Sequence, residues 1–455
     1  EGGDLRTAEL VGGMTLSNSR FASLTVDTLS VDLRISDGIV TVEELQGTIG
    51  GVSVEGAGRL AMAGDDSPEE LRLTFETESL EGLRPLLLGG EVIARDTLTI
   101  LERQILEFEG VDPDTLPTLA EVLVSGRMAG ELTIGGSFEN LSATGRAELE
   151  DGFLGGDHVE HAEVSFSVTK PFAPEQDIRV QLEAGGIRVS ERELASVSAS
   201  FSYGEQGGNV DVVLVRSPEE SYLARAAFDE EDDVLTIHLD ELVFRLPEER
   251  WNLGGPSTIS WDPYGLTFRD FRMRSPGSGG MRLTAQGRLP FDGTADFFLE
   301  TEALDVDRIA QVLQLDEVLE GVVDMNLRVT GTDAEPVMAL ELSTDGFRFR
   351  EFVFDRLEAN VDYADQRATG DVTLWSDSLQ VLTVTGQLPL DLSFNAVEER
   401  LPEEVINLVV VSDQLPLSLL MAPFPGYQDV VGTMSGRVEV RGTSRTLAPQ
   451  GQLTV

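Results

Sequence analysis

Only a few side chains in this 455-residue sequence have types and spacing that suit metal chemistry. His158 and His161 stand beside the carboxylates of Asp157, Glu160 and Glu163. A zinc site needs roughly three or four converging ligands. If this segment is a β-strand, positions three apart point to opposite faces of the sheet. We therefore predict a solvated loop edge here, and no metal site.

Other candidates for chemistry carry weaker signals. The acidic run 229–233 could hold Ca²⁺ weakly through its carboxylates, but its composition favours a solvated turn. No G-x-S-x-G elbow, phosphate-binding loop or H-E-x-x-H motif occurs. The chain has no cysteine, which excludes disulfides and cysteine-based metal sites. We expect no cofactor and no enzymatic activity.

Apolar residues at every second position form the pattern that does suggest a mechanism. Such alternation gives a β-strand one dry face and one wet face. The dry faces can meet and fill a core, or they can line an open hydrophobic groove for lipid. The candidate groove residues are Leu132, Ile134, Val164, Phe166, Val323, Met325, Leu327, Val329, Leu357, Val361, Val372, Leu374, Val438 and Val440.

A glycine rhythm repeats along the chain. Segments 126–136, 321–331 and 432–442 each begin and end with glycine. A hydroxyl residue follows each second glycine, namely Ser137, Thr332 and Thr443. A third glycine stands nine residues beyond the second at Gly145 and Gly451, whereas the middle copy has Leu340. Repetition of this kind indicates a strand-turn-strand unit used several times.

These signals predict a mainly β fold, an elongated, repetitive and curled sheet with a U-shaped groove. Strands with their turns take about 8–12 residues, so the chain has room for about 40 of them. An open twisted sheet that large has to curl. We expect short helices between the strand runs at 80–88, 304–319 and 415–421, and a further helical segment at 115–123.

The repeats divide the chain into four regions of one continuous array. We place them at 1–125, 126–286, 287–385 and 386–455, with the last region ending within a strand. No signal peptide is present, and no run of about 18 apolar residues could span a membrane. We interpret the sequence as a piece of a longer protein whose anchor lies outside it.

The chain is strongly acidic, with a formal net charge of −48. Such a field repels nucleic acid and anionic lipid headgroups. It also keeps a protein soluble. We expect no nucleic-acid partner.

Several phrases resemble the TamB family, the inner-membrane subunits of the translocation and assembly module. One is the glycine phrase with a later proline, Gly331-Thr332 with Pro336 and Gly442-Thr443 with Pro449. Others are the passages 251–259, 265–268 and 287–290. The wider AsmA-like group of bridge-type lipid transfer proteins shares this pattern of glycine-rich, alternating strands.

The resemblance implies a periplasmic β-structure with a hydrophobic inner face. It further implies an inner-membrane helix at the N-terminus of the full protein, an outer-membrane barrel partner of the Omp85 type, and a role in carrying phospholipid between the two membranes of a diderm bacterium. One alternative is a scaffold for outer-membrane protein and autotransporter assembly, in which a sheet edge pairs with client strands. Another is a closed β-solenoid adhesin, against which the scarcity of asparagine counts.

Overall fold

The computed structural model shows an almost purely β protein, in which the described residues form 26 strands of one sheet. The described residues are 9–21, 24–64, 69–88, 116–118, 122–138, 140–173, 175–189, 192–247, 249–277, 280–307, 319–349, 352–376, 378–395, 397, 399–417 and 432–454. They form two compact units, 1–227 with 245–247, and 228–244 with 248–455. This confirms the mainly β, repetitive sheet. The boundaries between the four predicted regions fall inside strands β6 (Val124–Gly136), β17 (Arg282–Pro290) and β23 (Leu379–Pro389).

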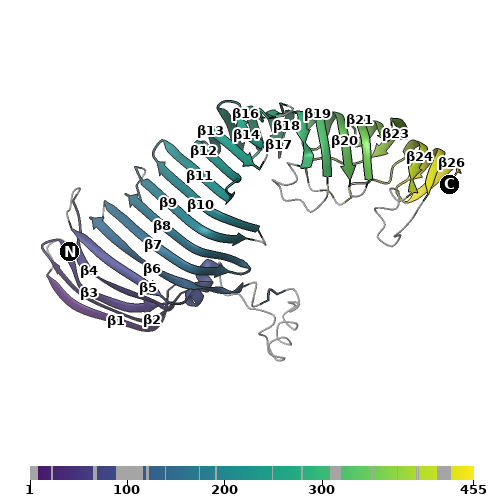
Figure 1. The fold of residues 1–455 in the computed structure, drawn as a ribbon. Helices are drawn as coiled ribbons and strands as arrows, with labels where there is room; N and C mark the ends of the chain where they lie inside the picture. The colour runs from purple at the N-terminus through teal and green to yellow at the C-terminus, as the bar shows by residue number, and fades with distance from the viewer. Residues whose placement is uncertain are drawn as a thin grey trace. The chain divides into compact units, whose positions relative to one another are not determined.

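The first unit is built of strands that each pair antiparallel with the next along the chain (Figure 1). They are β1 (Leu10–Phe21), β2 (Leu24–Ser36), β3 (Ile39–Ile49), β4 (Val52–Ala61), β5 (Glu70–Thr77), β6 (Val124–Gly136), β7 (Leu141–Leu154), β8 (Asp157–Thr169), β9 (Asp177–Val189), β10 (Arg192–Gly204) and β11 (Gly207–Ser217). Strand β12 (Glu220–Glu231) follows and crosses the boundary between the units.

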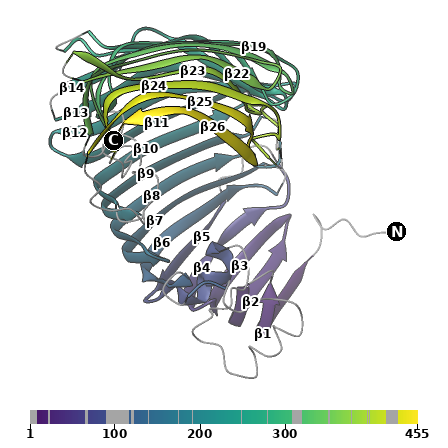
Figure 2. The same ribbon diagram turned by 90° about the vertical axis from the view of Figure 1, so that its right-hand side faces the viewer.

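The second unit continues the same plan. Its strands are β13 (Val234–Leu246), β14 (Glu249–Leu253), β15 (Ser257–Asp262), β16 (Gly265–Arg274), β17 (Arg282–Pro290), β18 (Thr294–Asp305), β19 (Leu319–Thr332), β20 (Pro336–Phe349), β21 (Phe352–Ala364), β22 (Arg367–Ser376), β23 (Leu379–Pro389), β24 (Ile406–Pro416), β25 (Thr433–Thr443) and β26 (Thr446–Thr454). Strands β14 and β15 act as one interrupted strand between β13 and β16. Figure 2 shows the strands of this unit bowed along their length, as expected of a curled sheet.

The glycine repeat corresponds to one long strand followed by a turn and the next strand. Segments 126–136 and 321–331 lie within β6 and β19, and 432–442 covers β25 but for its last residue. In the following strands Gly145, Leu340 and Gly451 occupy matching places, because each pairs with an apolar residue of the repeat strand. The predicted strand-turn-strand unit is therefore confirmed.

The hydroxyl residue after the second glycine organises the turn. In the middle copy the Thr332 Oγ1 accepts a hydrogen bond of 3.0 Å from the backbone N–H of Glu335. In the first copy the Ser137 Oγ accepts one of 3.2 Å from the N–H of Asn140. Side-chain oxygens that bind backbone N–H groups two or three residues later are typical of turns. This accounts for the glycine-hydroxyl pair in physical terms.

The structure supports one of the predicted helical segments and corrects where two others begin. A short helical turn is formed by η2 (Leu80–Leu83) and α1 (Arg84–Leu87), and the Ser79 side chain accepts from the N–H of Glu81 at its start. Leu304 and Leu415, expected to begin helices, instead lie in the last residues of strands β18 and β24, because both side chains are buried in the sheet. Residues 308–318 and 418–421 lie outside the described part of the chain. In the predicted segment 115–123, residues 116–118 are not helical and Val122 has a 3₁₀ conformation, while residues 115 and 119–121 lie outside the described part of the chain.

Bulges bend the strands of the second unit near one of their ends. The registers shift between Thr301 and Leu304, between Glu320 and Val322, and between Ser412 and Leu415. A β-bulge adds a residue to one strand, which increases the local twist and bends the strand. Beside these bulges lies a buried cluster that consists of Phe354, Leu374, Val381, Leu415 and Met434.

At the opposite ends of the strands, the connection between β23 and β24 folds back along neighbouring turns. We call residues 390–405 the tip connection. The backbone N–H of Leu392 donates to the Tyr363 hydroxyl at 2.8 Å, and that of Phe394 donates to the Asp333 carbonyl at 2.9 Å. Arg400 holds the connection together by donating to the carbonyls of Asp391 and Ser393.

Candidate functional site

One face of the sheet in the second unit is apolar across consecutive strands. Strand registers place the residues of this face in rows that run from strand to strand. The central row reads Phe271, Ala285, Leu299, Leu327, Leu340, Val361, Gly370, Gly386, Leu408, Val440 and Pro449. Because paired residues of neighbouring strands point to the same side, the row is a continuous apolar path across β16 to β26.

The predicted residues of the second unit all lie on this face. Leu327, Val361 and Val440 belong to the central row. The row beside it joins Met325, Leu342, Ala359, Val372, Val384, Val410 and Val438. Val323 is linked through Thr344 to Leu357 and Leu374, and Val329 stands two positions after Leu327 in β19. The structure thus brings the set together, while its role in lipid binding stays a prediction.

The first unit has an apolar face of the same kind. One row joins Met14, Val31, Leu45, Gly56, Leu73, Leu132, Gly145, Phe166, Val180, Phe201 and Val210. The predicted residues Leu132 and Phe166 are therefore in register, and Ile134 and Val164 lie two positions away from them on the same face. All the predicted positions of this unit share one face.

The two faces of the sheet differ in their charged residues. Among the described residues, those that the registers place on the apolar face of β16 to β26 include no Asp, Glu, Lys, Arg or His. The whole chain contains 25% charged residues. A face so free of charge can hold hydrocarbon without desolvating an ion.

The middle of the apolar face is only partly shielded from solvent. Met325, Leu327, Leu340 and Leu342 are half-buried, although they lie at the centre of long strands. Residues at a filled core would be fully buried. The central positions therefore combine apolar chemistry with access, which is what a hydrocarbon ligand requires.

Several polar groups on this face are satisfied within the protein. The Tyr363 hydroxyl accepts from the N–H of Leu392, and the Thr344 Oγ1 accepts from the N–H of Leu357 at 3.2 Å. The Thr301 Oγ1 donates to the Val323 carbonyl at 3.4 Å. Ser412 in β24 differs from them, because its Oγ is buried without a hydrogen-bond partner.

Sequence reasoning missed part of the face. Leu340, Leu342, Leu408 and Val410 belong to the two central rows, and their alternation is as clear as that of the predicted groove residues. The sequence therefore contains the signal that would have found them. Phe271 is different, because the bulge that turns it onto this face breaks the two-residue period.

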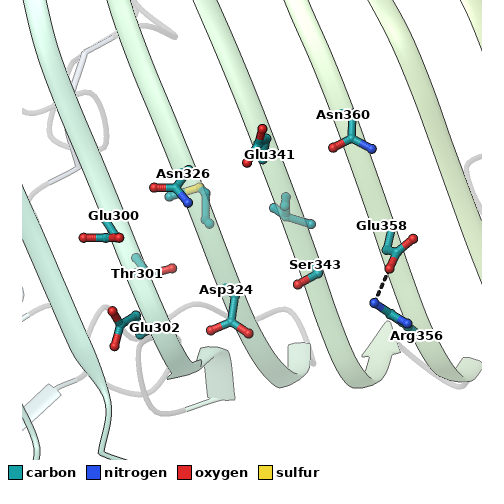
Figure 3. Close-up of a pocket in the computed structure, with 12 residues that line it drawn as sticks. Glu300, Thr301, Glu302, Asp324, Asn326, Glu341, Ser343, Arg356, Glu358 and Asn360 are labelled. Carbon is teal, nitrogen blue, oxygen red and sulfur yellow. Dashed lines mark ion pairs between the residues drawn. The ribbon is translucent and has the colours of Figure 1, made fainter.

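The opposite face carries the charge. Figure 3 shows side chains of β18 to β21 that project from this face. They line a hollow of about 450 Å³. Glu300, Asn326, Glu341 and Asn360 form one row across it, and an ion pair links Arg356 to Glu358 in the row beside them. Carboxylates and amides at this density keep the polar face hydrated.

A bidentate ion pair stiffens the polar face at the first strands of the second unit. The Arg288 guanidinium donates to both oxygens of Asp262, at 2.7 and 2.9 Å. These hydrogen bonds from Arg288 hold the pKa of the Asp262 carboxyl below its usual value. The pair joins β15 to β17 across the intervening strand β16 and is only partly exposed, which strengthens it relative to a fully solvated pair.

The two histidines do not form a metal site. Both lie in strand β8 rather than on a loop edge, which corrects that expectation. The ring of His158 stacks on Phe153 with a centroid distance of 4.2 Å, and His161 pairs with Glu150. Within the described ranges no group of three or more His, Asp or Glu side chains is arranged to hold a metal ion. Asp232 and Asp233 form a turn, as the acidic run predicts.

Among the described helical segments, none has the length and apolar character needed to cross a membrane. No protein-family model, no curated protein and no solved structure matches this chain. The function proposed below therefore depends on the residues and their arrangement, together with the resemblance of the repeated phrases.

Proposed function

We propose that this chain binds the acyl chains of phospholipids on its apolar face and conducts them along the rows of the sheet. The observation that supports this most strongly is the charge-free face that continues from β16 to β26 with a half-buried centre. A purely structural core has no need for rows that remain apolar and partly accessible over so many strands.

The physics of such a face suits transport. Each CH₂ group removed from water contributes about 0.8 kcal/mol, so an acyl chain is held by the sum of many weak contacts. Along the central row the side chains are of similar chemistry, and a bound chain can shift from one strand to the next while it keeps most of its contacts. The headgroup stays in water, where the polar face and its acidic charge keep the protein soluble.

The cellular setting of the proposal comes from the TamB-like phrases. It is a periplasmic bridge between the inner and the outer membrane, anchored by a helix outside this sequence and joined to an outer-membrane barrel of the Omp85 type. The ligand class, phospholipid, follows from that setting, whereas acyl-chain binding follows from the apolar face.

Photo-crosslinking tests the primary proposal. A crosslinking residue at Leu327, on the apolar face, is compared in cells with one at Arg328, its neighbour on the polar face. We expect phospholipid adducts at Leu327 and none at Arg328. Adducts to protein alone, or to neither position, would contradict lipid conduction and favour the scaffold.

A charge placed on the face gives an independent test. Leu340→Asp puts a carboxylate into the central row, and Ala339→Asp puts the same carboxylate on the polar face one residue away. We expect the first variant to abolish lipid adducts at Leu327 and the second to keep them. Equal adducts in both variants would separate lipid binding from the central row.

A further inference from the structure

Three phenylalanine rings gather on the apolar face of the second unit, on strands β16 and β18. We call Phe268, Phe271 and Phe297 the aromatic cluster. The ring of Phe268 lies 6.3 Å from that of Phe271 and 5.8 Å from that of Phe297, measured between centroids. Phe271 begins the central row. Phe268 and Phe297 belong to the row on the other side of it from Met325, which continues to Val329. The cluster therefore spans two rows along which an acyl chain would move.

A bulge creates this cluster. Phe268 pairs with Gly287 and Phe271 pairs with Ala285, so β16 has one residue more than β17 over this stretch. Residues three apart in a regular strand face opposite sides. The extra residue turns Phe271 onto the apolar face, and Asp270 adopts a positive φ of 56° to allow it. A strained backbone is used here to add a second ring to the face.

Gly287 provides the space in which the rings meet. It lies in register between Phe268 on one side and Phe297 on the other. A Cβ at this position would come within 1.9 Å of the Asp296 carbonyl oxygen and 3.1 Å of the Phe297 Cα. Only glycine allows β17 and β18 to approach so closely at this point, which lets the rings of Phe268 and Phe297 meet across it.

Burial within the cluster is deepest at Phe297. Phe297 is 7% exposed and Val329, packed beside it, is 3% exposed. Phe268 and Phe271 are half-buried, as are Leu327 and Leu340 farther along the face. The face is thus filled by its own side chains at Phe297 and Val329, and the two other rings pack against them.

We propose that the aromatic cluster is a barrier that limits the passage of acyl chains along the second unit. This inference rests on the proposed function. A chain that moves from β15 toward β19 along these two rows has to displace the ring-ring contacts of the cluster. Loss of contacts of this kind slows a step by about two- to tenfold. The size of residue 268 then sets the rate of passage but not the amount of lipid bound beyond it.

Time-resolved crosslinking tests the barrier. One crosslinking residue replaces Ile259, which pairs with Phe268 from β15, and another replaces Leu327 beyond the cluster. Purified protein receives labelled phosphatidylcholine from vesicles, and adducts at each position are followed over time. We expect a lag between the two positions. Phe268→Leu should shorten this lag severalfold, and Phe268→Trp should lengthen it.

A matched control is Phe75→Leu, because the Phe75 ring lies against Gly130 on the apolar face of the first unit. This variant should leave the lag unchanged. The urea midpoint of each variant is measured to confirm that it is folded.

The outcomes separate the two proposals. Adducts at neither Ile259 nor Leu327 in the unaltered protein would overturn the lipid function and the barrier with it. Adducts at both positions with no lag, or with a lag that ignores the size of residue 268, would overturn the barrier alone. If both Phe268→Leu and Phe268→Trp lengthen the lag, the cluster has a role in folding only. That result would also overturn the proposal of a barrier.

Discussion

The carboxylate of Asp333 ties Asn395, which lies 62 residues later in the chain, to the turn between β19 and β20. The Asn395 Nδ2 donates to one oxygen at 2.8 Å, and the backbone N–H of Gly293 donates to the other at 3.0 Å. These hydrogen bonds hold the pKa of the Asp333 carboxyl below its usual value, the Asn395 bond being the largest cause. One side chain thus joins the tip connection to two neighbouring turns.

Replacing this carboxylate should loosen the tip connection. In Asp333→Asn the new amide has a single acceptor oxygen in place of two, so one donor loses its partner. We expect hydrogen exchange at the amides of Leu392 and Phe394 to accelerate, with little change in the central strands. Hydrogen exchange followed by mass spectrometry measures this.

The control for that experiment is Asp365→Asn at the next turn. Asp365 is exposed and has a positive φ of 52°, a conformation that asparagine tolerates. It should leave exchange in the tip connection unchanged. Equal exchange in Asp333→Asn and in the unaltered protein would show that the Asp333 contacts do not hold the connection.

The Asp262–Arg288 pair predicts how stability responds to acid. The folded-state pKa of Asp262 lies below its unfolded value. Its contribution to stability is therefore complete above the unfolded pKa of about 3.9 and is lost as pH falls through the folded pKa. We expect the urea midpoint to fall on acidification below about pH 4, and to fall less steeply in Asp262→Asn.

Asp296→Asn is the matched control for the acid dependence. Asp296 is exposed and lies opposite Arg288 in β18. Its replacement should preserve the steep acid dependence. If the urea midpoints of both variants depend on pH in the same way, the Asp262–Arg288 pair is not the cause of the acid dependence.

Much of the fold could be predicted because the alternation has a direct physical cause. A strand with one dry face needs an apolar residue at every second position, so the spacing of Met325, Leu327 and Val329 is enough to assign them to one face. The hydroxyl after the second glycine likewise marks a turn by local chemistry alone, as at Thr332.

The features that escaped prediction depend on contacts between distant segments. Leu304 and Leu415 precede residues with helical spacing, but pairing with neighbouring strands decides their conformation. Phe271 reaches the apolar face only through a bulge, which alternation cannot reveal. The link from Asp333 to Asn395 has no local signal at all. Local periodicity therefore predicts which residues form the apolar face. It does not predict the bulge that adds Phe271 to this face or the hydrogen bond that links Asp333 to Asn395.

Substitution of Gly370 tests whether glycines occur on the apolar face because they let neighbouring strands approach closely. A Cβ here would lie 2.0 Å from the Asn360 carbonyl oxygen and 2.9 Å from the Val361 Cα, both in the backbone of the neighbouring strand. Gly370→Ala should force β21 and β22 apart and lower the free energy of unfolding by about 1–3 kcal/mol. Urea denaturation measures the loss.

Gly185→Ala provides the comparison. The Cβ at Gly185 would meet the nearest atom at 3.6 Å, an ordinary contact, in a strand interior of the first unit. Alanine there should be neutral or slightly stabilising. An equal loss at both positions would argue against close strand approach as the reason for Gly370.

The turn hydroxyls should differ in their contributions to stability because they differ in burial. Ser137 is fully buried; its Oγ accepts from the N–H of Asn140 and donates to the Gly64 carbonyl at 2.8 Å. Thr332 makes the equivalent turn contact nearer to solvent. We expect Ser137→Ala to cost on the order of 2 kcal/mol and Thr332→Val about 1 kcal/mol, because a buried group left unpaired costs more than one that water can reach. Urea denaturation of the two variants checks the order. A larger loss for Thr332→Val would mean that the turn contact, and not the additional bond to Gly64, dominates at both positions.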